Sequence, residues 1–287
     1  MRLPCLVAAL AMLLPGAPGL ADPAESIARG DAAWQRRAEG ADGPRADPGP
    51  VQEAVAAYAA ALEEDPSRHE ARWKLMRALY FQGEHTGLDD DARLAVFERG
   101  RELGEEGLDR LAEGLGGREA LDDLSPAEVA AALGSEPAAA PLYFWTAVHW
   151  GLWGQTRGKM AAARQGVASR IRDGALATIA LDPVYEQAGG HRVLGRLHDE
   201  APKIPFVTGW VDRDTAVREL ERAVELAPDD TLNRLYLAEA LLRRERARRD
   251  EALELLRGLA QEEPRDHCRV EDAKALADAR ALLRRAG

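Results

Sequence analysis

The sequence of 287 residues is poor in the residue types on which several common architectures depend. Its two cysteines, Cys5 and Cys268, are too few for a disulfide framework. Aromatic residues make up only 5% of the chain, whereas hydrophobic residues reach 46% and many of them are alanine. Alanine suits close contacts between helices, while a β-sandwich would need more Val, Ile, Thr and Tyr. The composition therefore predicts an all-α protein that is held together by packing alone.

The sequence also has fewer basic than acidic residues. The chain has 49 acidic residues against 38 Lys and Arg, which gives a formal net charge of −11. Nucleic acids and anionic membranes bind proteins mainly through basic patches. The sequence therefore argues against both as partners.

The apolar run near the start, Leu6–Leu14, is too short to span a lipid bilayer. It follows the basic Arg2, and small residues at positions 19 and 21 precede Asp22 in the pattern of a cleavage site. We predict that residues 1–21 are a secretory signal peptide and that 22–287 form a single all-helical domain; a buried first helix is the alternative. Because Cys5 precedes the run, we expect no lipid anchor. The predicted location is a bacterial periplasm, with no membrane segment after processing.

A recurring spacing predicts how the helices pack. A small residue is followed four positions later by a bulky apolar one, then three later by a small or apolar one, then five later by proline. The complete copies are Ala54-Tyr58-Ala61-Pro66, Ala216-Leu220-Ala223-Pro228 and Ala252-Leu256-Leu259-Pro264. Positions four and three apart share one helix face, so the stripe forms a groove for a neighbouring helix. The proline then ends the helix. A weaker copy ends at Pro183.

These copies resemble the tetratricopeptide repeat (TPR), a helix-turn-helix unit of about 34 residues. Leu194-Gly195 and Leu237-Ala238 fit the bulky–small pair that such units carry on their first helix. The resemblance implies a TPR-like α-solenoid of antiparallel helix hairpins, with a less regular, aromatic-rich central section. Insertions between helices are expected at residues 40–50 and 201–212.

Two helices of the central section have recognisable starts. Residues 89–115 read as one long helix, with Asp89 and the two following aspartates at its positive end. Ser125 and Pro126, with Glu128 shortly after them, mark the start of a further helix.

Residues 142–154 contain three of the six tryptophans. On a helix, Trp145, His149 and Trp153 share one face, while Tyr143 and Trp150 share another. A segment that is apolar on every side is either buried or lines a cavity. Both interpretations stay open here. Trp and Tyr favour a ligand pocket because each combines a flat apolar face with a polar group that needs a partner. All five residues are candidate ligand contacts.

The glycines at positions 189 and 190 predict a turn, followed by a helix that carries Arg192 and His198. Arg192 is a candidate for binding an anion, and a structural ion pair is the alternative. His191 and His198 lie about 10 Å apart along a helix axis and cannot bind one metal ion together. Trp210 lies in the insertion at 201–212, for which ligand contact and a packed cap over helix ends are both open.

Motifs for catalysis are absent from the sequence. It contains no Gly-x-Ser-x-Gly, no His-Glu-x-x-His and no phosphate-binding loop with Lys-Ser/Thr. The aspartates at 89–91 lack the glycine and final glutamate of an EF-hand. We therefore expect a binding protein that is not an enzyme and that uses neither a cofactor nor a metal.

Three stretches, in this order, resemble a more specific family: the TatT-type periplasmic component of tripartite ATP-independent periplasmic (TRAP) transporters. They are Val96–Leu108, Tyr143–Gly151, and Gly189–Gly195 with the repeat helix that ends before Pro228. The resemblance implies an accessory protein that binds a small apolar or carboxylate ligand, the substrate-binding protein of the transporter, or both. The chain departs from the family in lacking a lipobox.

A second hypothesis is a periplasmic TPR scaffold, unrelated to transport, that binds a protein or peptide on its concave surface. A cavity beside Trp145, His149 and Trp153 would favour transport, whereas a solid core beside an open groove would favour the scaffold. The sequence leaves open which ligand and partner are bound and whether the protein forms homo-oligomers.

Overall fold

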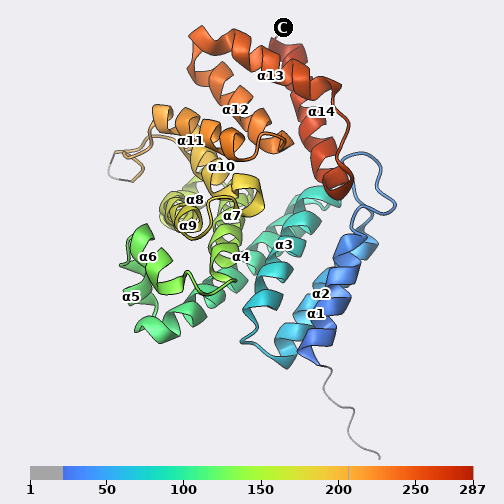
Figure 1. The fold of residues 1–287 in the computed structure, drawn as a ribbon, viewed down its shortest axis with the longest axis vertical. Coiled ribbons are helices and arrows are strands. Elements are labelled where there is room, and N and C mark those ends of the chain that lie inside the picture. Colours follow the sequence, from blue (N-terminus) through green and yellow to red (C-terminus); the bar gives the residue numbers. More distant parts are fainter. Residues whose placement is uncertain (1–21, 206, 287) are drawn as a thin grey trace, which may run out of the picture.

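The structure is a computed structural model that describes residues 22–205 and 207–286 (Figure 1). This part of the chain is all-α, with fourteen α-helices and no β-strand. The predicted signal peptide, residues 1–21, lies outside the described residues. The helices are α1 (Pro23–Gln35), α2 (Pro48–Glu64), α3 (His69–His85), α4 (Asp90–Ala112), α5 (Arg118–Asp122), α6 (Pro126–Leu133), α7 (Ala139–Arg157), α8 (Lys159–Arg164), α9 (Val167–Leu181), α10 (Tyr185–Glu200), α11 (Arg213–Leu226), α12 (Thr231–Arg244), α13 (Arg249–Gln261) and α14 (Arg269–Ala286).

Helices that follow one another in the sequence pack against one another in space. This holds from α1 to α4 and from α9 to α14, and α7 joins the two series through its contacts with α4 and α9. Figure 1 shows the resulting array, in which the colours progress in order along the stack. The prediction of an all-α, solenoid-like fold is confirmed.

The repeated spacing acts as expected in the core. Its nine positions that precede the prolines are all buried, with an exposed fraction of at most 1%. Pro66, Pro228 and Pro264 follow the ends of α2, α11 and α13 and lie in the turns that lead to α3, α12 and α14. Gly195 of α10 shows why a small residue is needed. A Cβ atom there would lie 2.7 Å from Leu220 Cγ of α11, so the glycine lets the two helices approach.

Both predicted helix starts in the central section are present. The Asp89 carboxylate accepts a hydrogen bond of 2.8 Å from the backbone N–H of Ala92, at the start of α4. Ser125 and Glu128 form a capping box at the start of α6. Local sequence therefore determines where these helices begin.

The two ends of the helix array meet. Val270 of α14 is fully buried in the same hydrophobic cluster as Trp34 of α1 and Phe81 of α3. Arg37, just after α1, forms a 3.0 Å ion pair with Glu271. In Figure 1 the start of α14 lies beside the loop between α1 and α2. The array is therefore closed by side-chain contacts between its first and last helices.

Among the helices that the structure describes, none is both long enough and apolar enough to span a bilayer.

Candidate functional site

The five candidates on α7 lie in the interior of the molecule. Tyr143, Trp145, His149, Trp150 and Trp153 all have exposed fractions of 8% or less. Helix α7 packs against α3, α4, α9 and α10, so it is covered on several sides. This burial matches the all-round apolar character of its sequence.

His149 is fully buried, and its Nε2 lies 2.9 Å from the carbonyl oxygen of Met76. Its Nδ1 has no partner in the described part of the protein. Burial lowers the pKa of His149 to about 4, because a charged ring would be desolvated there. A Cβ atom at Gly100 would lie 2.2 Å from the ring, so α4 encloses this histidine tightly.

Trp150 and Trp153 form a second packed group. The Trp150 indole N–H donates a 2.6 Å hydrogen bond to Glu105, and the Arg101 guanidinium lies 4.7 Å and 5.0 Å from the centroids of the two tryptophan rings. Burial also raises the pKa of Tyr143 to about 12. These placements favour the core interpretation for Tyr143, His149, Trp150 and Trp153. These four residues are therefore not part of the candidate site.

His198 and Trp210 hold the insertion against α10. His198 Nδ1 accepts a 2.9 Å hydrogen bond from the backbone N–H of Asp212, and its ring lies 5.5 Å from that of Trp210. Arg172 of α9 covers Trp210, with its guanidinium 4.6 Å from the ring centroid. Both residues thus have the contacts of a packed cap over a helix end.

Arg192 and Trp145 differ from the other candidates because both reach a group of residues in the middle of the molecule. Trp145 donates a 3.1 Å hydrogen bond from its indole N–H to the hydroxyl of Tyr185, and its ring lies 5.3 Å from that of Tyr80. Arg192 donates a 2.8 Å hydrogen bond to Asn233 Oδ1 of α12.

We call this group the central cluster. It comprises Arg77 and Tyr80 of α3, Tyr185, Glu186 and Arg192 of α10, and Tyr236 of α12. Trp145 connects Tyr80 of α3 to Tyr185 of α10, and Arg192 connects α10 to Asn233 of α12. The pKa of Tyr80 is raised by burial first, then by Glu84 and Tyr236, and is lowered by Arg192. Burial likewise raises the pKa of Glu186, against the charges of Arg77 and Arg192. Figure 1 shows α3, α10 and α12 surrounding the middle of the molecule.

The tyrosines of the central cluster are partly covered by neighbouring helices. Tyr80, Tyr185 and Tyr236 are only half-buried, so solvent reaches each of them. Burial nevertheless raises the pKa of all three phenols. A phenol that protein surrounds on most sides is desolvated, so its pKa rises even though solvent still reaches part of the ring. The hydroxyls of Tyr80 and Tyr236 form no hydrogen bond with other described residues.

A strained turn holds Glu186 in the central cluster. Glu186, Gln187 and Ala188 all have left-handed backbone conformations, with φ of 48°, 57° and 60°. Such a conformation costs roughly 1–2 kcal/mol for each non-glycine residue. Arg192 donates to the carbonyls of Glu186 and Gln187, and Asn233 donates to that of Gln187 at 2.9 Å. Strain of this kind persists where the surroundings fix it, and it is concentrated at functional sites.

This turn corrects the prediction that the glycines at 189 and 190 make the turn. Both lie in the right-handed part of α10 and have no positive φ. A Cβ atom at Gly189 would lie 2.5 Å from Phe144, and one at Gly190 would lie 2.8 Å from Ile179. The glycines allow α10 to pack closely on α7 and α9, while non-glycine residues make the turn.

Two charged groups of the central cluster form no ion pair in the described part of the protein. Arg77 forms no ion pair and its Nε is buried without a partner, but its guanidinium lies near the Tyr58 phenol and opposes the rise in the pKa of that group. Its guanidinium lies 4.2 Å from the ring centroid of Trp34 and 5.1 Å from that of Trp73. The Glu186 carboxylate likewise forms no ion pair. Other charges nearby are engaged, as Arg37 is with Glu271. Unpaired half-buried charges are unusual in a structural core and point to binding.

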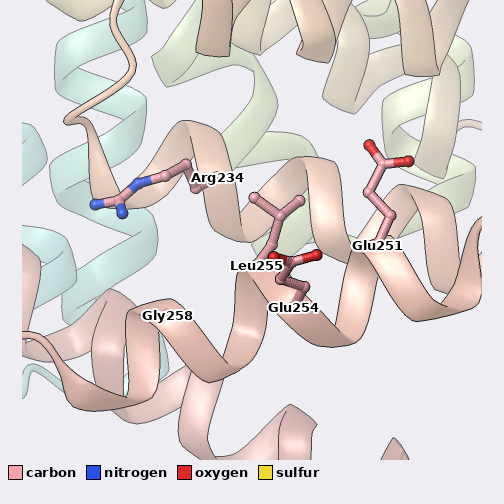
Figure 2. Close-up of a pocket in the computed structure, with 5 residues that line it drawn as sticks. All are labelled: Arg234, Glu251, Glu254, Leu255 and Gly258. Atoms are coloured by element: carbon pink, nitrogen blue, oxygen red, sulfur yellow. The ribbon is translucent and has the colours of Figure 1, made fainter.

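Two pockets lie elsewhere. Figure 2 shows one of about 260 Å³ between α12 and α13, where Arg234, Glu251 and Glu254 project beside Leu255. Arg234 is already bonded to Glu262, so its charge is not available. The other, of about 280 Å³, lies where the ends of the array meet, with Lys274 among its lining residues. Neither gathers groups from as many helices as the central cluster does.

The described residues contain no group of three or more His, Cys, Asp or Glu side chains arranged to hold a metal ion. Cys268 is a half-buried free thiol, and burial raises its pKa to about 11, which makes it a poor nucleophile.

Most residues of the central cluster were missed from the sequence: Arg77, Tyr80, Tyr185, Glu186 and Tyr236. The signal that could have found them is their position. Each lies on a helix that follows a repeat proline, as α3 follows Pro66 and α12 follows Pro228. In this array, those helices turn one face to the centre.

No protein-family model matches this chain, and no curated protein matches its sequence.

Proposed function

We propose that the protein is a periplasmic, TPR-like binding protein that takes up a small ligand at the central cluster. In this proposal it serves as an accessory component of a TRAP-type transport system, in keeping with the resemblance of its sequence to TatT-type proteins. The observation that carries the proposal is the set of half-buried polar groups, none of them in an ion pair, that α3, α10 and α12 contribute to the central cluster. These are Arg77, Glu186 and the hydroxyls of Tyr80 and Tyr236.

The chemistry of the central cluster suits a ligand with an apolar body and a carboxylate. The Tyr80 and Tyr236 rings offer flat apolar faces with hydroxyls at their edges. A guanidinium that stacks on indole rings, as that of Arg77 does, keeps its N–H edge available for a carboxylate. The cluster carries no arrangement of nucleophile and base, so binding without reaction is the function that it supports best.

The burial of Trp145, His149 and Trp153 counts in favour of the scaffold hypothesis, whereas the contact between the ends of the array counts against it. An extended peptide or a protein surface needs a long, open groove. The burial of Val270 against α1 and α3, and the Arg37–Glu271 ion pair, close the array at that side. This closure favours a small ligand over a macromolecule.

Tryptophan fluorescence of the purified protein, titrated with hexanoate, 4-phenylbutyrate and benzoate, tests the proposal. Trp34 and Trp73 lie beside Arg77, so we expect saturable quenching or a spectral shift with at least one carboxylate. Arg77→Met should weaken the response about tenfold or more, since a charge-assisted bidentate contact is lost. Arg257→Met is the matched control because Arg257 is exposed on α13. No response to any carboxylate would contradict the proposal.

The transport context has its own test. We expect the substrate-binding protein of a TRAP transporter from the same organism to bind this protein in biolayer interferometry, with a salt-dependent association rate. If the two proteins do not bind each other while the small ligand still binds, the role in transport is wrong and the ligand-binding function stands.

A further inference from the structure

The pocket of about 280 Å³ where the ends of the helix array meet has polar groups from three separate segments in its wall. We call it the seam pocket. Arg45 belongs to the loop between α1 and α2, His85 is the last residue of α3, and Lys274 lies on α14. In Figure 1 this loop and the start of α14 lie side by side. The seam pocket therefore depends on the contact between the two ends of the array.

His85 is a buried polar group in the wall of the seam pocket. Only 3% of the residue is exposed, and neither ring nitrogen forms a hydrogen bond with a described residue. The rings of Phe81 and Tyr80 hold the imidazole, with centroids 4.9 Å and 6.2 Å away. Burial lowers the pKa of His85 to about 4, so the neutral ring offers one N–H donor and one acceptor at pH 7. The Pro44 carbonyl opposes this shift from outside hydrogen-bonding geometry. A buried ring of this kind needs a polar partner.

The backbone on both sides of the pocket fixes the position of Arg45. Asp42 and Arg45 exchange two backbone hydrogen bonds of 2.9 Å and 3.1 Å, and the Ala46 N–H donates to the His85 carbonyl at 2.7 Å. A Cβ atom at Gly87 would lie 2.8 Å from the guanidinium carbon of Arg45, so the glycine allows this group to lie against the backbone after α3. The guanidinium forms no ion pair and no hydrogen bond with a described residue. Its N–H groups are therefore available.

Lys274 supplies a second positive charge. Its ammonium lies 3.7 Å from Glu84 and 3.9 Å from Asp278, and both distances exceed that of a hydrogen bond. Glu84 is bonded instead to Arg93 at 2.6 Å, and Asp278 is exposed on α14. Glu84 and Asp278 are the acids in the pocket wall, and neither takes up the donors of the two cations at close range. N–H donors thus outnumber the acceptors that are bonded to them.

We propose that the seam pocket binds a small oxyanion, such as a phosphate or a short carboxylate, held by Arg45, Lys274 and a ring N–H of His85. The planar fork of a guanidinium matches two oxygens of such an anion, and a neutral imidazole donates to it as well. The volume lies just below the range of about 300–1,000 Å³ of pockets for drug-sized ligands, so it suits a ligand of few atoms. A cation would be repelled by Arg45 and Lys274.

A bound oxyanion would join the loop after α1, the end of α3 and α14, and it would stabilise the closed array by binding the folded state. The seam pocket shares no lining residue with the central cluster. The proposal therefore goes beyond the proposed function and does not rest on it.

Isothermal titration calorimetry of the purified protein with sodium phosphate, acetate and succinate, at an ionic strength held constant with NaCl, tests the proposal. The net charge of −11 disfavours unspecific attraction of anions, so we expect saturable binding of at least one of them to report a built site. Phosphate alone would identify a phosphate site, and the carboxylates alone a carboxylate site. The anion that binds should also raise the thermal midpoint of unfolding.

Three variants locate the binding. Arg45→Gln and Lys274→Gln should each weaken it about fivefold or more, because each removes a charge-assisted contact from the edge of the pocket. His85→Phe keeps a flat ring against Phe81 and removes the N–H, so it should also weaken binding. Arg257→Gln and Lys159→Gln remove the same charges at exposed positions outside the pocket and should bind like the natural protein. Circular dichroism of each variant checks that the fold is retained.

Two results would overturn the proposal. One is the absence of binding by all three anions at about 10 mM, which is weaker than any useful site. The other is an equal loss of affinity in Arg45→Gln and Arg257→Gln, which would show attraction to the surface in general. The fluorescence titration of the central cluster has its own variant, Arg77→Met, so the two proposals can fail separately.

Discussion

Gly100 in α4 provides a direct test of how tightly the central section is packed. A Cβ atom built on it would lie 2.2 Å, 2.3 Å and 2.5 Å from three atoms of the His149 ring. The ring is fully buried and bonded to the Met76 carbonyl at 2.9 Å, so it has nowhere to move without breaking that bond. Gly100→Ala therefore has two opposing effects on stability: it improves the helix propensity of α4, and it overpacks the core.

The sizes of these two effects decide whether Gly100→Ala raises or lowers the free energy of unfolding. Replacing glycine by alanine inside a helix gains about 1 kcal/mol of helix stability. Overpacking a close-packed core costs about 1–3 kcal/mol. Displacing His149 also leaves a buried N–H and a buried carbonyl unsatisfied, at about 1–3 kcal/mol. We expect Gly100→Ala to lower the free energy of unfolding by about 1–5 kcal/mol after the gain is subtracted.

Gly258→Ala is the matched control, because Gly258 also lies inside a helix but has open space where a Cβ atom would be. We expect it to raise the free energy of unfolding by about 0.5–1 kcal/mol. Urea unfolding followed by circular dichroism measures both variants. If Gly100→Ala is as stable as Gly258→Ala, the His149 ring is not confined and the reasoning about this core is wrong.

Three further predictions follow from buried polar groups and from one cap. The pKa of His149 falls from 6.5 to about 4 on folding, so the unfolded chain binds more protons between these values. Stability should therefore decrease by up to about 3 kcal/mol as pH falls from 6.5 to 4; His149→Gln, which does not titrate, should show less pH dependence in urea unfolding. Asn233→Leu removes both donors to the carbonyls of Gln187 and Ala223 and should cost about 2–4 kcal/mol in the same assay, whereas retained stability would show that the strained turn needs no support. Ser125→Ala should lower stability by about 1 kcal/mol through loss of the capping box, and an unchanged thermal midpoint would contradict this.

The sequence by itself determined the helices and their ends. Asp89 and Ser125 act within a few residues of their own positions, so their effect could be predicted without knowing the fold. The small–large–small spacing is equally local, since residues four and three apart share a helix face wherever the helix lies. The burial of Ala216, Leu220 and Ala223 follows from that geometry.

The tertiary structure alone decided which side chains meet. Tyr80 and Tyr236 are separated by more than 150 residues, and their position in the central cluster depends on how the array curls between α3 and α12. The aromatic segment of α7 marked a buried helix, yet its neighbours decided that Phe144 and Trp145 are the residues that contact Tyr185 of the cluster. The left-handed turn at Glu186 contradicts the local preference of its residues, and contacts from Arg192 and Asn233 hold it in place. Local patterns could not predict it, because distant residues stabilise the strained backbone.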